Sequence, residues 1–138
     1  MKLLLDTHVL LWWLADEPRL GRQARDLIGD PGNDILVSMV SLWEIAVKTR
    51  VGKLTADAVE IAEVIQRGGY VRLDIKPAHL AALSSLPMHH RDPFDHLLIA
   101  QAIAEDAAFV SDDRNAHRYP VRLIAGLHGR KPDRPGSP

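Results

Sequence analysis

Residues 2–14 read KLLLDTHVLLWWL, and this stretch decides the fold. Leu3–Leu5 is a short, fully apolar run, which is typical of a strand buried on both faces of a parallel sheet. Asp6 ends the run, and the apolar residues from Thr7 to Ala15 recur at helical spacing. The stretch therefore predicts a buried strand that leads directly into a helix.

The same alternation continues along the chain. Apolar runs at 35–37 and 108–110 predict two more strands, and weaker candidates lie at 71–73 and, as an edge strand, at 121–123. Between them, apolar spacing, prolines and glycines predict helices at 22–28, 40–50, 57–67, 77–84 and 94–105. Strands that alternate with helices in this way predict an α/β fold of three layers, with a central, mainly parallel sheet of four to five strands.

Composition limits the class of protein. The chain has 138 residues, 46% of them hydrophobic, which suits one domain with one sizeable core. We expect that domain to span residues 1–125 and to be followed by a disordered tail at 126–138, whose last nine residues include three prolines. The absence of cysteine excludes disulfides, thiolate zinc sites and cysteine nucleophiles. No apolar run approaches the ~20 residues that span a bilayer, so we expect a cytoplasmic protein without a membrane segment.

The overall charge does not favour nucleic-acid binding by itself. The formal net charge is −1, whereas a protein that holds nucleic acid by bulk charge is usually basic. Any contact with nucleic acid must therefore come from a local patch, or from a metal ion that offsets acidic residues.

Four acidic residues are predicted to meet at one edge of the sheet. Asp6 follows the first strand and Asp113 follows the strand at 108–110, while Glu44 and Asp95 are expected in the first turns of two helices. In a parallel sheet the carboxyl ends of the strands and the N-termini of the crossover helices lie at the same edge, where ligands of open α/β sheets bind.

Helix capping is the alternative interpretation of each acid. Ser41 and Glu44 match a capping box, and Asp92 precedes a proline, as the N-cap of a helix often does. Capping does not explain why the neighbours of all four acids are so apolar. Carboxylates among apolar side chains are costly unless a positive charge pairs with them, and a hard divalent cation would serve all four.

The carboxylate ligands indicate which metal ion and which reaction to expect. Carboxylates and water suit Mg²⁺ or Mn²⁺ better than zinc. Such an ion can activate a water and stabilise a phosphate during in-line attack. Because the cluster offers no nucleophilic side chain, phosphodiester hydrolysis is the natural reaction.

Four motifs together resemble those of PIN domains, and in particular the VapC toxins of bacterial toxin–antitoxin pairs. They cover the chain from residue 1 to about residue 125 and occur in the family's order and spacing. The motifs are Leu3–His8, Val40–Lys48, Arg91–Ala102 and Ser111–Asp113. Ser111 stands where the family usually has threonine, and the spacing of the last motif favours Asp113 over Asp112 as its acid.

The resemblance implies a PIN-like fold and an endoribonuclease that uses Mg²⁺, or Mn²⁺, and leaves a 5′-phosphate and a 3′-hydroxyl. It implies a homodimer that is inhibited by a small VapB-type antitoxin. It also implies that Asp6 and Asp95 are the leading metal ligands, and that Glu44 and Asp113 complete the catalytic pocket.

Other residues are expected around this pocket. Thr7, Ser41, Asp92 and Ser111 are expected to support the acids. The candidates for RNA contact are Lys48, Arg50, Arg91 and His96, although a solvated helix end also explains the basic cluster that follows Glu44. His96 stands where relatives often have arginine.

Two groups of aromatic residues carry further expectations. His89 and His90 are expected at the surface of a loop. Trp12, Trp13 and Trp43 are expected in the core or at a dimer contact. Because adjacent helical residues point about 100° apart, one of Trp12 and Trp13 is a candidate for the dimer or antitoxin interface.

Two other functions remain open from the sequence. The first is a metal-dependent phosphatase or DNA nuclease, although the chain lacks both the Asp-x-Asp pair of aspartyl phosphatases and the helical insertions of a DNA flap nuclease. The second is a PIN-like binding module without catalysis, although such modules usually lose one or more of the acids that this chain keeps.

Overall fold

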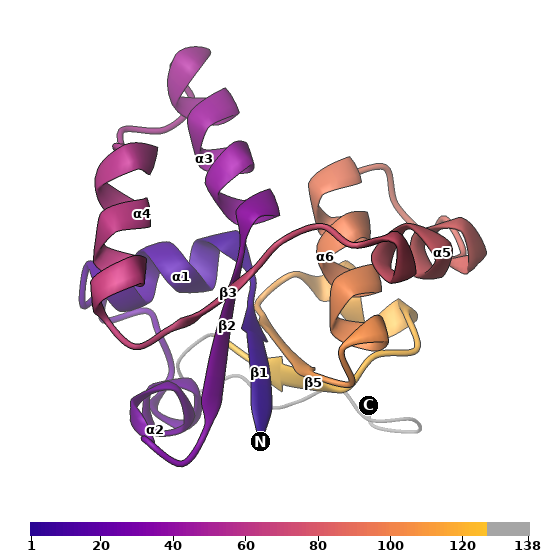
Figure 1. The fold of residues 1–138 in the computed structure, drawn as a ribbon, viewed down its shortest axis with the longest axis horizontal. Coiled ribbons are helices and arrows are strands. Elements are labelled where there is room, and N and C mark those ends of the chain that lie inside the picture. Colours follow the sequence, from indigo (N-terminus) through magenta and orange to yellow (C-terminus); the bar gives the residue numbers. More distant parts are fainter. Residues whose placement is uncertain (127–138) are drawn as a thin grey trace.

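A five-stranded, all-parallel sheet forms the centre of the computed structural model, which describes residues 1–126 (Figure 1). The strands lie in the order β3-β2-β1-β4-β5. Their bounds are Lys2–Leu5 (β1), Asp34–Ser38 (β2), Val71–Leu73 (β3), Ala108–Ser111 (β4) and Leu123–Ala125 (β5). The predicted α/β class and the count of strands are confirmed.

Six α-helices and one 3-10 helix connect the strands. They are α1 (Thr7–Leu14), α2 (Arg22–Gly29), α3 (Met39–Arg50), α4 (Ala58–Arg67), α5 (Pro77–Ser85), α6 (Pro93–Ala104) and η1 (Arg114–Arg118). Helices α1, α2 and α4 lie on one side of the sheet, and α5 and α6 lie on the other (Figure 1). The chain thus has the predicted three layers.

The first strand shows why its sequence is apolar throughout. Leu3 and Leu5 belong to the core beneath α1, α2 and α4, while Leu4 belongs to the core beneath α5 and α6. All three side chains are fully buried. Successive side chains of a strand point to opposite faces, so a central strand covered on both faces needs an apolar residue at every position.

The edge strand lies two residues later than predicted. The sequence placed it at 121–123, whereas β5 pairs with β4 through Phe109 beside Leu123 and Val110 beside Ile124. The apolar run continues through Ile124 and Ala125, so its pattern does not reveal where pairing begins. The proposed boundary at residue 125 stays a prediction, because residues 127–138, nearly all of the predicted tail, lie outside the described residues.

Strand order places a crevice at the carboxyl end of β1. From β1 the chain proceeds through β2 to β3 on one side, and later through β4 to β5 on the other. The carboxyl ends of β1 and β4 therefore flank the point where the order reverses, which is where open α/β sheets bind ligands. Among the helices of residues 1–126, none is long and apolar enough to cross a membrane.

Candidate functional site

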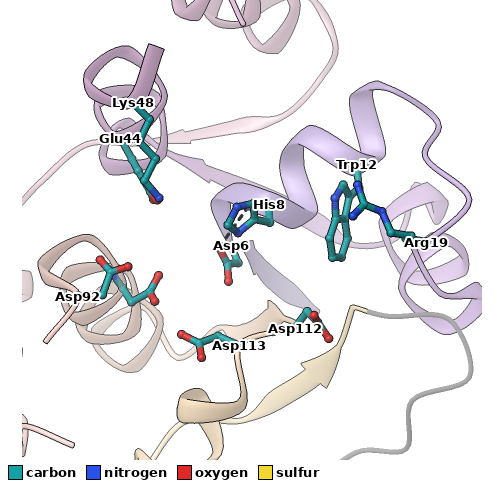
Figure 2. Close-up of a pocket in the computed structure, with 10 residues that line it drawn as sticks. Asp6, His8, Trp12, Arg19, Glu44, Lys48, Asp92, Asp112 and Asp113 are labelled. Carbon is teal, nitrogen blue, oxygen red and sulfur yellow. Dashed lines mark hydrogen bonds and ion pairs between the residues drawn. The ribbon is translucent and has the colours of Figure 1, made fainter. Parts of the chain in front are cut away.

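A polar cavity of about 590 Å³ lies at this crevice (Figure 2). The structure brings all four predicted acids together in its lining, from four different parts of the chain. The lining residues are Asp6, His8, Trp12, Arg19, Glu44, Lys48, Asp92, Asp95, Asp112 and Asp113.

Asp6 joins the end of β1 to the start of α1. Its Oδ1 accepts a hydrogen bond from the His8 N–H at 3.3 Å, so it caps the helix as the alternative interpretation expected. Its Oδ2 accepts a hydrogen bond from the Ser111 hydroxyl at 2.6 Å. Burial raises the pKa of Asp6 above its ordinary value, because the ionised carboxylate is removed from water. Asp6 therefore both caps α1 and lines the cavity.

Glu44 is not in the first turn of its helix, as the sequence suggested. Helix α3 begins at Met39, and the Ser38 hydroxyl caps it by accepting from the Val40 N–H at 3.0 Å. The capping box of Ser41 and Glu44 is therefore wrong. Both residues lie farther along the helix and are buried.

A small network holds the Glu44 carboxylate. The Thr7 hydroxyl donates to Glu44 Oε1 at 2.7 Å and lies 3.0 Å from the Ser41 hydroxyl. Lys48, one helical turn away, forms an ion pair with Glu44 Oε2. Burial acts to lower the pKa of Lys48, but the hydrogen bond and the charge of Glu44 outweigh it and raise that pKa. Lys48 is therefore a member of the cavity rather than a solvated residue at the helix end.

Asp95 and Asp113 form a hydrogen-bonded carboxyl pair in the cavity. Burial and a hydrogen bond with Asp113 raise the pKa of Asp95 to about 10. Burial acts to raise the pKa of Asp113 too, but the hydrogen bond with Asp95 outweighs it and leaves that pKa below its ordinary value. The pair therefore keeps a proton between its two carboxyl groups when no cation is bound, as two close carboxylates do.

Asp113, rather than Asp112, faces the other acids. Its side chain is directed toward the side of the cavity that holds Asp92, whereas the Asp112 side chain is directed away (Figure 2). Asp113 also caps η1 by accepting from the Asn115 N–H at 2.9 Å. Asp92 caps α6, as predicted, by accepting from the N–H groups of Phe94 and Asp95.

His90 was expected at the surface, and this expectation is wrong. Its side chain is only 12% exposed, and Nε2 lies 3.5 Å from Asp95 Oδ2 and 3.8 Å from Asp113 Oδ2. Ligand atoms of His90, Asp95 and Asp113 all lie within 4.8 Å of one another, so this group could hold a metal ion. The only signal in the sequence was that His90 directly precedes the motif containing Asp92 and Asp95.

The four residues predicted to contact RNA do not all lie at the cavity. Lys48 lines the cavity, whereas Arg50 and Arg91 are exposed outside its lining. His96 is only 8% exposed, and its ring packs against His90 and Tyr119. The expectation of an RNA contact from His96 is corrected, because its ring faces the protein interior.

Two further lining residues, Trp12 and Arg19, lie outside the four motifs. Trp12 lies between His8 and Arg19, with the Arg19 guanidinium 5.1 Å from the centre of the indole ring. Trp13 does not line this cavity, and its Nε1 donates to the Tyr70 hydroxyl at 2.7 Å. The two tryptophans thus have different surroundings, as predicted for neighbours on a helix. Trp12 and Arg19 add an aromatic and cationic wall to the acidic centre of the cavity.

The donor set fits a hard divalent cation. Carboxylate oxygens predominate in the cavity lining, and oxygen is the donor that Mg²⁺ and Mn²⁺ prefer. Hydroxyl groups of Thr7 and Ser111 already orient two of the carboxylates. A site of oriented carboxylates at a sheet edge is suited to hold a cation beside a phosphate.

Comparison with known proteins gives consistent matches. Residues 3–121 match the PIN domain family. Ribonuclease VapC22 of Mycobacterium tuberculosis (strain ATCC 25618 / H37Rv) is 31% identical over 121 residues, which cover 85% of this chain and 92% of that protein.

Solved structures match over nearly the whole fold. VapBC2 from Rickettsia felis, bound to a DNA fragment from the promoter, gives a TM-score of 0.71 at 18% identity and covers 91% of this chain and 99% of that chain. DNA-bound VapBC from Salmonella typhimurium gives a TM-score of 0.67 at 15% identity and covers 91% of this chain and 98% of that chain. At these identities the likeness establishes the fold alone.

Proposed function

We propose a function from one premise: the chain belongs to the PIN domain family and, within it, to the VapC-type toxin ribonucleases. From this premise, we propose that the chain is a Mg²⁺-dependent endoribonuclease that hydrolyses RNA as the toxin of a toxin–antitoxin pair. The observation that carries the proposal is the convergence of Asp6, Glu44, Asp95 and Asp113 in one cavity where the strand order reverses.

In this proposal the four acids hold the metal ion, Mg²⁺ or alternatively Mn²⁺. When bound, the ion would supply the positive charge that activates a water and neutralises the scissile phosphate. The rest is done by the protein itself. Ser111 orients Asp6, Thr7 orients Glu44, and Asp92 fixes the first turn of the helix that carries Asp95. The products are a 5′-phosphate and a 3′-hydroxyl.

The RNA backbone is proposed to pass between two cations of the cavity lining, Arg19 and Lys48. Arg19 is exposed beside Trp12, and Lys48 lies across the cavity on α3. These two cations are the local positive charge that a chain with a net charge of −1 needs for contact with phosphates. Arg50 and Arg91 stay as candidates for contacts farther along the strand.

The proposed partners are a VapB-type antitoxin and a second copy of the chain, in the cytoplasm. The structural neighbours from Rickettsia felis and Salmonella typhimurium are complexes of this VapBC type, which supports the antitoxin. An exposed apolar row supports self-association; it consists of Trp43 and Val47 on α3 and Val51, which directly follows the helix. Light scattering after size-exclusion chromatography tests it, because Trp43→Ser is expected to yield the monomer if this row is the contact.

The activity itself is tested with purified protein and a panel of substrates. We expect cleavage of RNA, but not of DNA or a phosphomonoester, and we expect EDTA to abolish it and Mg²⁺ to restore it. Asp6→Asn should be inactive, while Asp26→Asn, an exposed residue on α2, serves as the matched control. Cleavage of DNA or the phosphomonoester instead would favour the DNA nuclease or phosphatase.

Expression in a bacterial host tests the role as a toxin. Growth arrest with discrete RNA fragments is expected from the wild type and from Asp26→Asn, but not from Asp6→Asn. If soluble wild-type protein neither binds Mg²⁺ in calorimetry nor cleaves any substrate, a non-catalytic binding module becomes the better proposal.

A further inference from the structure

The Tyr119 hydroxyl lies beneath the loop that carries His90. Tyr119 is 4% exposed. Its oxygen accepts hydrogen bonds from the backbone N–H of His89 at 3.0 Å and from that of His90 at 3.3 Å. A phenol oxygen has two lone pairs, so these two N–H groups occupy its capacity as an acceptor.

The same hydroxyl donates its own proton to the ring of His90. The Tyr119 oxygen lies 2.7 Å from His90 Nδ1. With both lone pairs of the phenol engaged, the hydroxyl donates and Nδ1 accepts. A neutral imidazole whose Nδ1 accepts a hydrogen bond carries its proton on Nε2. Tyr119 therefore fixes the Nε2–H tautomer of His90.

That Nε2–H is directed into the acidic cavity. The atom is buried and makes no hydrogen bond of ordinary length within residues 1–126, and its nearest polar neighbours are Asp95 Oδ2 at 3.5 Å and Asp113 Oδ2 at 3.8 Å. A buried donor beside two carboxylates is attracted to whichever of them is ionised. Small movements of either carboxylate bring it into hydrogen-bond range.

We propose that His90 is a positioning residue, held by Tyr119 as an Nε2–H donor that orients the Asp95–Asp113 pair toward the metal ion. The inference deepens the proposed function, because it takes the acidic cavity as the metal site. It also assigns His90 a place outside the ligand set, although its ring lies close enough to coordinate. To bind the ion directly, His90 would need a free lone pair on Nε2, and its proton would then be on Nδ1. That Nδ1–H would point at the Tyr119 oxygen, whose lone pairs already accept from two backbone N–H groups.

The arrangement has a consequence for metal choice. A nitrogen donor in the cavity would favour Zn²⁺ or Co²⁺, whereas a cavity of oxygen donors favours Mg²⁺ and Mn²⁺. By keeping Nε2 protonated, Tyr119 keeps the His90 nitrogen out of the coordination sphere. Loss of the Tyr119 hydroxyl would free His90 to present its lone pair to the ion.

The first test reads the tautomer directly in metal-free protein. Long-range ¹H–¹⁵N correlation spectra of the histidine side chains, recorded where the imidazoles are neutral, should show His90 protonated at Nε2. The His90 signals are assigned by their loss in His90→Gln. In Tyr119→Phe the preference should shift toward Nδ1–H, and in Tyr70→Phe, which removes a phenol away from the cavity, it should not. An Nδ1–H tautomer in the wild type would overturn the inference.

The second test measures metal binding by calorimetry, with circular dichroism to verify folding. Tyr119→Phe and His90→Asn should bind Mg²⁺ about 10–100-fold more weakly. His90→Gln, whose amide N–H lies near the position of Nε2, should stay close to the wild type. In Tyr119→Phe the Co²⁺ absorption spectrum should change toward nitrogen coordination.

The outcomes separate this inference from the proposed function. Unchanged Mg²⁺ affinity in both His90→Asn and Tyr119→Phe would overturn the positioning role. A wild type that binds no Mg²⁺ would overturn the proposed metal site and with it this role of His90, while the tautomer measurement would still report on the Tyr119 hydrogen bond.

Discussion

The Ser111 hydroxyl donates a hydrogen bond of 2.6 Å to Asp6 Oδ2, which connects the ends of two adjacent strands that are 105 residues apart in sequence. The same hydroxyl accepts from the Asp113 N–H at 3.0 Å. One side chain therefore orients the acid that follows β1 and fixes the turn that presents a second acid. Ser111 itself is buried.

Replacing Ser111 with alanine should weaken the metal site more than the fold. The loss of the hydroxyl leaves Asp6 without its donor, and we expect Mg²⁺ affinity to fall about tenfold, as for other groups that orient metal ligands. The free energy of unfolding should fall by about 1–2 kcal/mol. Calorimetry and urea unfolding measure the two effects. Ser111→Thr keeps the hydroxyl and should bind Mg²⁺ like the wild type; equal affinity in Ser111→Ala would refute the role of this hydrogen bond.

Replacing Asp95 with asparagine should abolish cleavage and stabilise the metal-free protein at neutral pH. Folding raises the pKa of Asp95 from 3.8 to about 10, so the folded state holds a proton that the unfolded state releases. Such a group costs increasing stability as the pH rises between these two values. Asparagine removes this cost, and a gain of about 1 kcal/mol is expected.

Thermal unfolding with and without Mg²⁺ measures this effect. Mg²⁺ should raise the melting temperature of the wild type but not that of Asp95→Asn, because only the wild type has all four of the proposed ligands. A variant that cleaves RNA at the wild-type rate would show that Asp95 is not a ligand.

The prediction from sequence succeeded where burial dictates the residue. The apolar run Leu3–Leu5 predicts a central strand, because a strand that is covered on both faces needs apolar residues throughout. Asp6 and Asp113 could be predicted to meet, because they follow two strands that are adjacent in the sheet. The prediction failed where two nearby residues could each begin the same helix. Ser38 and Ser41 are both plausible caps for α3, and the sequence does not reveal which one begins the helix.

Contacts between distant loops could not be predicted from the sequence. Tyr119 contacts His90 across 29 residues, and neither belongs to a periodic pattern or a spaced motif. The stacking of Arg19 on Trp12 depends on the turn after α1, whose path is set by packing. Side chains that meet only through tertiary structure leave no signal in one sequence.

A buried histidine gives stability that acid should remove. His79 is fully buried, and its Nε2 lies 2.8 Å from Glu105 Oε2. Its Nδ1 accepts from the Lys76 N–H, so Nε2 is the donor. This hydrogen bond lowers the pKa of Glu105 below its ordinary 4.5. The pair therefore stabilises the fold above that value, and the stability is lost as the pH falls through the lower pKa of the folded state.

Glu105→Gln should therefore be less stable than the wild type at neutral pH, by about 1–3 kcal/mol, and the difference should shrink in acid. Urea unfolding across the acidic range measures it. Glu63→Gln, an exposed residue on α4, is the control and should follow the wild type at every pH. A constant difference between Glu105→Gln and the wild type at all pH values would contradict the assignment.

Arg19 should contribute to RNA affinity but not to metal affinity. Its side chain is 64% exposed and stacks over Trp12 at the cavity wall. Arg19→Ala, in an Asp6→Asn background that prevents cleavage, should bind RNA more weakly, and the slope of affinity against salt should fall by about 1. Fluorescence anisotropy measures both. Arg22→Ala, an exposed residue on α2, should leave both unchanged; an equal loss in the two variants would indicate a nonspecific charge effect.

The order of strands also governs when the four acids can be brought together during synthesis of the chain. The first strand made, β1, becomes central only when β4 pairs beside it, and β4 carries both the donor to Asp6 and the turn to Asp113. A growing chain that has not yet released β4 from the ribosome holds three of the four acids without the strand that assembles them. Until β4 emerges, the growing chain therefore has neither the Ser111 donor to Asp6 nor Asp113, and the four acids cannot be brought together.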